Sequence, residues 1–93
     1  MEDRFLGFRR YLVQQKRAAP NTVASYLRDV AGLGRFAGFS ADIDYAAASP
    51  DLVSSYLNQL KDQGRKPSTL NRVRASISCY YRYLTEQGIA NGN

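Results

Sequence analysis

Apolar residues recur at every third or fourth position along most of this chain of 93 residues, and each of its three prolines stands where such a stretch begins. A repeat near 3.6 residues indicates an amphipathic helix. Proline suits the first position of a helix, because its missing N–H would be unpaired there anyway. No segment alternates polar and apolar residues as a strand would. The sequence therefore predicts an all-α fold, a compact four-helix domain with a single core.

The first two helices are expected over residues 2–17 and from Pro20 onward. Phe5, Phe8 and Leu12 form the apolar stripe of the first helix, and Leu6 and Val13 widen it. Glycines at positions 32, 34 and 38 predict that the later half of the second helix frays or bends. The core positions expected in the second helix are Val23, Tyr26, Leu27, Val30, Leu33 and Ala37.

The third helix is expected to begin at Pro50, with Ser49 as its N-cap, and to stop at Gly64. The fourth is expected from Pro67 to about residue 87, followed by a terminal glycine at position 88. Residues 40–48 read as a loop. The core positions expected in these two helices are Leu52, Val53, Tyr56, Leu57, Leu60, Leu70, Val73, Ile77, Tyr80, Tyr81 and Leu84.

Charge is distributed in blocks that point to an acidic partner. The net charge is +5, and residues 1–39 and 61–82 carry the basic excess, whereas residues 40–60 carry three acids and no base. Nucleic acid is the first candidate partner and an anionic membrane surface the second. No run approaches the length of a membrane span. A chain without histidine and with one cysteine offers no ordinary metal site, and we expect neither a metal nor a cofactor. The single cysteine fits a reducing cytoplasm.

The two basic blocks each contain the same helix start. "PNTV" at residues 20–23 and "PSTL" at 67–70 share Pro-(Asn/Ser)-Thr-aliphatic, and Lys16, Arg17, Arg65 and Lys66 precede them. Such a start is also ordinary helix-capping chemistry. Its duplication beside basic residues favours two helices that offer their N-terminal halves to DNA, since arginine and asparagine match base edges, while hydroxyls and helix N-termini suit phosphates.

At 100° per residue, each of these two helices has a face opposite its core stripe that mixes arginines with small or polar residues. On the second helix this face holds Asn21, Ala24, Ser25, Arg28, Gly32 and Arg35. On the fourth it holds Ser68, Asn71, Arg72, Ala75, Ser78, Cys79 and Arg82, with Arg74 on its flank. Small side chains would let the backbone approach a groove closely.

Three motifs in this order resemble the N-terminal core-binding, or SAM-like, domain of tyrosine recombinases, the phage-integrase family. The motifs are Asn21-Thr22, Tyr26-x-x-Asp29, and Gly64-x-x-Pro67-Ser68-Thr69 leading into Tyr80-Tyr81-x-Tyr83-Leu84. The resemblance covers about residues 3–90. It implies a helical domain that clamps one side of a recombination-site duplex through its second and fourth helices. Residues 1–93 would form that single domain, with a catalytic domain expected C-terminal to Asn93.

Carried over residue by residue, the resemblance assigns DNA contacts to both helices. The first contact helix would use Asn21, Thr22, Ser25 and Arg28, and the other would use Lys66, Ser68, Thr69, Asn71, Arg72 and Arg74. Phosphate contacts are expected of Thr22, Lys66, Ser68 and Thr69, and base contacts of Arg28, Asn71 and Arg72. The family often has serine before each proline, whereas Ala19 and Lys66 stand there in this chain.

Cleavage in this family uses a tyrosine nucleophile assisted by arginines, a lysine and histidines. A chain without histidine cannot hold that set, so we expect the domain alone to be inert within a parent tyrosine recombinase. Four of its seven tyrosines fall on core-facing positions, whereas Tyr11, Tyr45 and Tyr83 are expected to be half-exposed. Asp29 is expected to pair with a neighbouring arginine or to stabilise the second helix.

The resemblance also implies partners and a location. They are double-stranded DNA and other protomers in a tetramer of the full-length protein, while the isolated fragment is expected to be a monomer without a membrane partner. The location would be the cytoplasm, in association with the nucleoid. The protein would be bacterial, archaeal or phage-encoded. Two other functions remain open: a free-standing DNA-binding or excision accessory protein, and a protein-interaction bundle whose basic face meets an acidic partner.

Overall fold

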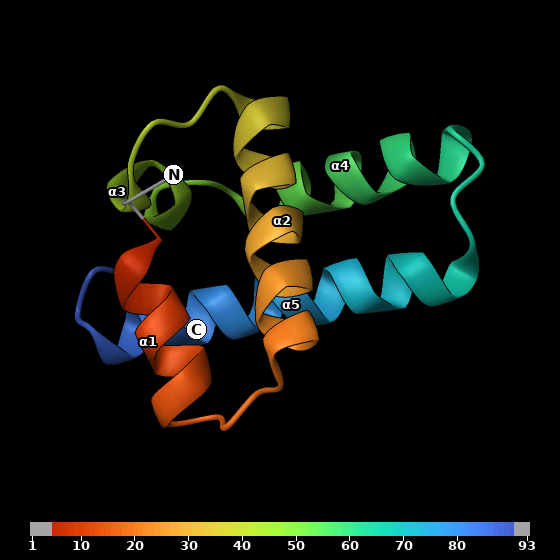
Figure 1. The fold of residues 1–93 in the computed structure, drawn as a ribbon. Helices are drawn as coiled ribbons and strands as arrows, with labels where there is room; N and C mark the ends of the chain where they lie inside the picture. The colour runs from red at the N-terminus through yellow and green to blue at the C-terminus, as the bar shows by residue number, and fades with distance from the viewer. Residues whose placement is uncertain (1–4, 91–93) are drawn as a thin grey trace.

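The computed structural model describes residues 5–90, which form an all-α domain without strands in that range, as predicted (Figure 1). Four long helices match the expected ones, and one short helix lies between the second and third of them. In chain order the helices are α1 Leu6–Gln14, α2 Pro20–Ala37, α3 Asp42–Ala46, α4 Pro50–Asp62 and α5 Pro67–Glu86.

The prolines begin three of these helices, as the sequence predicts. The residues before them, Ala19, Ser49 and Lys66, are all extended, with ψ between 151° and 156°. That conformation is the one that proline imposes on the residue before it. None of the three makes a side-chain cap. Ser49 therefore occupies the expected N-cap position, but its hydroxyl does not cap α4.

The helices form two antiparallel pairs laid across each other. In Figure 1, α1 and α2 run side by side, and the pair formed by α4 and α5 crosses behind α2. The most extensive contact is between α2 and α5, and α5 also packs on α1, α3 and α4. The helix at the end of the chain is therefore the centre of the domain.

Aromatic rings fill the core where α5 meets α1 and α3. The Tyr80 ring is fully buried and lies 4.9 Å from the Tyr45 ring and 5.0 Å from the Phe8 ring, both edge-on. Edge-on pairs at such distances add to the stability gained by burial. Phe5, Phe8 and Leu12 of the first helix are buried here, which confirms the predicted stripe.

Residues 40–48 are not the loop that the sequence predicts. They contain α3, whose start is fixed by the Asp44 carboxylate, which accepts hydrogen bonds from the backbone N–H groups of Ser40 (2.7 Å) and Ala41 (3.0 Å). Tyr45, expected to be half-exposed, is fully buried, and its hydroxyl donates to the Val30 carbonyl. A five-residue helix is too short to produce a periodic signal, and its buried ring holds it in place.

Several other expectations about exposure and helix ends are wrong. Tyr11 and Tyr83 are buried because α1 lies directly on α5, whereas Leu6 and Val13 are 46% and 50% exposed. The first helix ends at Gln14, before the predicted residue 17, and the predicted residues 2–4 lie outside the described part. The later half of α2 does not fray, since α2 remains helical to Ala37.

Candidate nucleic-acid interface

The start of α2 presents exposed polar side chains next to backbone N–H groups that no side chain caps. Asn21, Thr22 and Arg28 are exposed, and Ser25 is half-buried. Unpaired N–H groups and the helix dipole make such a start attractive to anions. Three of the four residues predicted on α2 are therefore fully accessible to a ligand.

The start of α5 has the same character and more positive charge. Thr69 is half-buried, whereas the other predicted residues of this helix are exposed: Lys66, Ser68, Asn71, Arg72 and Arg74. Lys66 is the uncapped N-cap residue of α5. Arg65, immediately before it, is also exposed in the turn that joins α4 to α5. The second repeated start therefore offers a basic surface.

An ion pair between a buried carboxylate and a half-exposed arginine connects the two helices where they cross. The Arg72 guanidinium donates from Nε to Asp29 Oδ2 (3.0 Å) and from Nη2 to Asp29 Oδ1 (2.8 Å). Ser76 Oγ donates to the same carboxylate, 2.7 Å from Oδ2. Asp29 is 5% exposed and Ser76 is fully buried. These contacts confirm the expectation that Asp29 pairs with an arginine, and they raise the pKa of Arg72 above its usual value.

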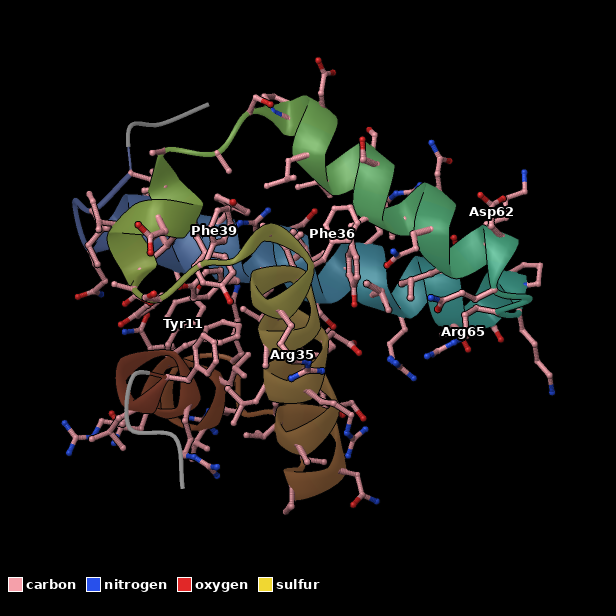
Figure 2. All side chains as sticks on the ribbon, turned by 90° about the horizontal axis from the view of Figure 1, so that it is seen from above. Tyr11, Arg35, Phe36, Phe39, Asp62 and Arg65 are labelled. Carbon is pink, nitrogen blue, oxygen red and sulfur yellow. The ribbon has the colours of Figure 1, made fainter. Side chains whose placement is uncertain are left out.

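A second basic group surrounds Tyr56 on α4. Burial raises the pKa of the Tyr56 hydroxyl and Asp29 adds to the rise, while Arg35 of α2 and Arg65 oppose it because their charges lie nearby. Figure 2 shows Arg35 and Arg65 on one side of α4, whereas Asp62 points to the other. Arg35 and Arg65 thus bring positive charge from two segments to the neighbourhood of Tyr56.

Lys16 and Arg17, predicted to flank the first start, lie in the connection between α1 and α2. The Lys16 ammonium is 5.7 Å from the centre of the Tyr11 ring, and its charge acts on the thiol of Cys79, in the second half of α5. Arg17 is exposed in this connection and has a left-handed backbone, with φ of 53°. Their contact with DNA beside the start of α2 stays a prediction.

Three residues of this region are missing from the sequence-based set of contacts. Asp29 and Ser76 support Arg72, and Arg35 joins the basic group. Arg35 could have been chosen from its place on the outward face of its helix, but the pairing of Asp29 with Arg72, 43 residues away, has no local signal. Gly32 and Cys79, predicted to face outward, pack against Tyr56 and the core respectively.

Burial disfavours ionisation of several tyrosine hydroxyls. Burial raises the pKa of Tyr11 and Tyr83 and raises that of Tyr81 to about 12. An activated nucleophile needs the opposite shift or an adjacent base. Within residues 5–90 no group of histidine, cysteine or carboxylate side chains could hold a metal ion, and none of the described helices is long and apolar enough to cross a membrane.

A pocket of about 390 Å³ at the C-terminal end of α5 differs from the two helix starts because its lining is mostly apolar. Its lining includes Ala46, Pro50, Val53 and Tyr81, and it contains no charged side chain. Charge and polar side chains gather instead at the starts of α2 and α5. Those two helix starts and the crossing between them are thus the candidate site, and the ligand that suits them is a polyanion.

Comparison with known proteins finds relatives that match most of this chain. XerD from Agrobacterium fabrum is 34% identical over 86 residues, covering 92% of this chain and 26% of its own length. XerC from Pelotomaculum thermopropionicum is 34% identical over 88 residues, covering 89% of this chain and 29% of its own length. XerC from Pelobacter propionicus is 36% identical over 92 residues, covering 94% and 29%. All three are tyrosine recombinases.

The chain spans between about a quarter and a third of the length of these relatives. No solved structure matches it significantly. The profile of the phage integrase N-terminal SAM-like domain matches residues 5–88, nearly the whole chain. The resemblance predicted from the three motifs is therefore confirmed, and the chain belongs to the family of phage integrase N-terminal SAM-like domains.

Proposed function

We propose that this domain is the DNA-binding module of a site-specific tyrosine recombinase and that it clamps one side of the recombination-site duplex through α2 and α5. The observation that carries the proposal is the pair of uncapped, polar helix starts on two helices joined at a buried crossing. Because α2 and α5 are joined through Asp29 and Arg72, the two starts are held in a fixed relation to each other.

The roles proposed for individual residues follow their exposure. Thr22, Lys66 and Ser68 are exposed beside the uncapped helix starts, which suits contacts with phosphates. Arg28 and Asn71 are exposed farther along α2 and α5 and carry the donor sets that match base edges. Ser25 and Thr69 are half-buried, so they would contact DNA only through their outer atoms.

Strand cleavage would belong to another part of the parent recombinase. Two observations support this division: the chain contains no histidine, and burial raises the pKa of several tyrosine hydroxyls. We expect the parent to act with other protomers, as a tetramer on two duplexes, and the isolated domain to be a monomer. Light scattering of the domain with and without DNA would test the second expectation.

The experiment that tests the proposal is fluorescence anisotropy of the domain with a labelled random-sequence duplex, titrated across salt concentrations. If about four to six phosphates are neutralised, the logarithm of affinity should fall with the logarithm of salt at a slope of about −4 to −5. Lys66→Ala should weaken binding to all sequences alike and make this slope shallower by about 1.

The matched control is Arg10→Ala. Arg10 is exposed on α1, next to Gln14, Tyr83 and Gln87 and far from the start of α5 along that helix. Its loss changes the net charge as much as the Lys66 substitution but should leave the slope nearly unchanged. Equal effects of the two variants would mean that net charge, and not the face described above, attracts the duplex.

Absence of duplex binding at low salt would contradict the proposal. The basic face would then serve a protein partner with an acidic surface. Binding to the duplex with a slope near zero would also contradict it, because a clamp on phosphates must displace counterions.

A further inference from the structure

The arginine at the crossing of α2 and α5 is held by one edge only. Asp29 accepts from Arg72 Nε and Nη2, and Ser76 donates to the same carboxylate while it is fully buried. The Arg72 side chain is nevertheless 42% exposed. One edge of the guanidinium is therefore bound to a buried carboxylate, although much of the side chain is open to solvent.

The remaining donors of Arg72 form a second fork. A guanidinium has five N–H groups in one plane. Asp29 accepts the N–H group of Nε and one of the two N–H groups of Nη2. Both N–H groups of Nη1 and the second one of Nη2 are not used by Asp29. One hydrogen of each terminal nitrogen points along the outer edge, side by side. Within residues 5–90, no group other than Asp29 accepts a hydrogen bond from the Arg72 guanidinium. Two parallel donors match the O6 and N7 acceptors of guanine in the major groove.

We propose that Asp29 and Ser76 are positioning residues that fix the outer edge of Arg72 so that it reads a guanine; this inference rests on the proposed DNA-binding function. A phosphate is a poorer match for this arginine, because the carboxylate of Asp29 offsets its charge and would repel a second anion. A guanine edge is neutral, and its recognition depends on the orientation of the two donors. The buried carboxylate supplies that orientation by holding the side chain in place.

The competing explanation is that the ion pair only joins α2 to α5. The two roles make different predictions for Asp29→Asn. If Asp29 merely stabilises the domain, the variant should bind all duplexes equally well or equally poorly. If Asp29 positions Arg72, the variant should lose one base preference while its affinity for random DNA stays the same or rises, since the binding face gains a positive charge.

The test is selection of preferred duplexes from a randomised library by the 93-residue chain and by its variants. The unsubstituted chain should select guanine at one position, and Asp29→Asn should reduce that preference by about 5- to 160-fold, the range for one bidentate base contact. Arg72→Lys, which keeps the charge but has no fork, should abolish the preference at the same position. Asp51→Asn, at an exposed position at the start of α4, is the charge-matched control and should leave all preferences unchanged.

Circular dichroism of each variant should accompany the selection, because the Asp29→Asn substitution could disturb a buried network. Ser76→Ala removes the hydroxyl that lies within hydrogen-bond distance of both the Asp29 carboxylate and the Arg72 carbonyl, but it leaves the ion pair itself intact. It should therefore cause a smaller loss at the same base position. If Asp29→Asn does not fold, the guanine preferences of Ser76→Ala and Arg72→Lys test the inference instead. An unchanged guanine preference in both would overturn the inference.

Other outcomes separate this inference from the proposed function. If the unsubstituted chain binds DNA but selects no guanine, or if Arg72→Lys weakens all duplexes alike, the chain binds DNA without the proposed reading, and only the inference fails. If the unsubstituted chain binds no duplex at all, both fail.

Discussion

Two tyrosine hydroxyls lie directly against glycines of neighbouring helices. A β-carbon added to Gly7 would lie 2.1 Å from the hydroxyl oxygen of Tyr83, and one added to Gly32 would lie 2.4 Å from that of Tyr56. Both tyrosines are buried. At these two positions glycine allows close approach of a helix to a ring, a requirement that outweighs its poor helix propensity.

Gly7→Ala should therefore destabilise the domain, although alanine is the better helix former by about 1 kcal/mol. The Tyr83 ring packs 5.3 Å from the Tyr11 ring and 5.6 Å from the Phe8 ring, so it has little room to move. Overpacking of this kind costs about 1–3 kcal/mol. Urea unfolding would measure the loss, and Tyr83→Phe in the same chain should restore most of it. If Gly7→Ala alone is stabilising, the contact between α1 and α5 is looser than described.

At the scale of the helices, the residues before the three prolines differ in whether their side chains could cap the helix and so stabilise it. Ala19, Ser49 and Lys66 are all extended and none caps its helix through its side chain. Serine at such a position normally contributes about 0.5–2 kcal/mol through a hydrogen bond to the second or third backbone N–H of the helix. The absence of this bond at Ser49 makes that residue a useful comparison.

Ala19→Ser should raise the free energy of unfolding by about 1 kcal/mol, since it supplies an acceptor to the free N–H groups of α2. Ser49→Ala should cost less than about 0.5 kcal/mol, because no cap is lost. Paired thermal and urea unfolding curves would check both values. A large loss for Ser49→Ala would indicate that its hydroxyl caps α4 in solution.

The helices that the sequence predicts are those whose signals are local. The prolines determine three starts, and apolar residues such as Phe8, Leu33 and Leu84 recur with helical spacing. Burial of Tyr11 and Tyr83 was missed because it depends on how many neighbours surround α5, which periodicity does not reveal. The sequence predicts that Asp29 pairs with an arginine but does not identify Arg72. Which arginine lies beside Asp29 depends on the register at which two helices distant in sequence cross.

For the molecule as a whole, the tyrosines link stability to alkaline pH. Burial raises the pKa of Tyr81 to about 12, and its hydroxyl donates to the Tyr45 carbonyl (2.6 Å). The unfolded value is near 10, so the folded state keeps this proton longer than the unfolded state does. The resulting stability is fully present below pH of about 10 and is lost as pH rises through about 12.

Urea midpoints measured from pH 8 upward should therefore stay level and then fall above pH of about 10. Tyr81→Phe should be less stable at pH 8 but should show a shallower decline. Tyrosinate absorbance offers an independent check, because part of the tyrosine signal should titrate later in the native protein than in urea. Ionisation of all tyrosines near pH 10 under native conditions would contradict the burial described above.

The central place of α5 has a consequence for the order in which the domain can assemble during synthesis. Every other helix packs on α5, yet α5 is the last of the five to be made (Figure 1). While a ribosome is still adding residues 67–86, the parts of α1 and α2 that pack on α5 remain uncovered. We expect folding to begin only when that last segment has emerged, so that the nascent chain exposes Phe8, Leu12 and Leu33 to chaperones until then.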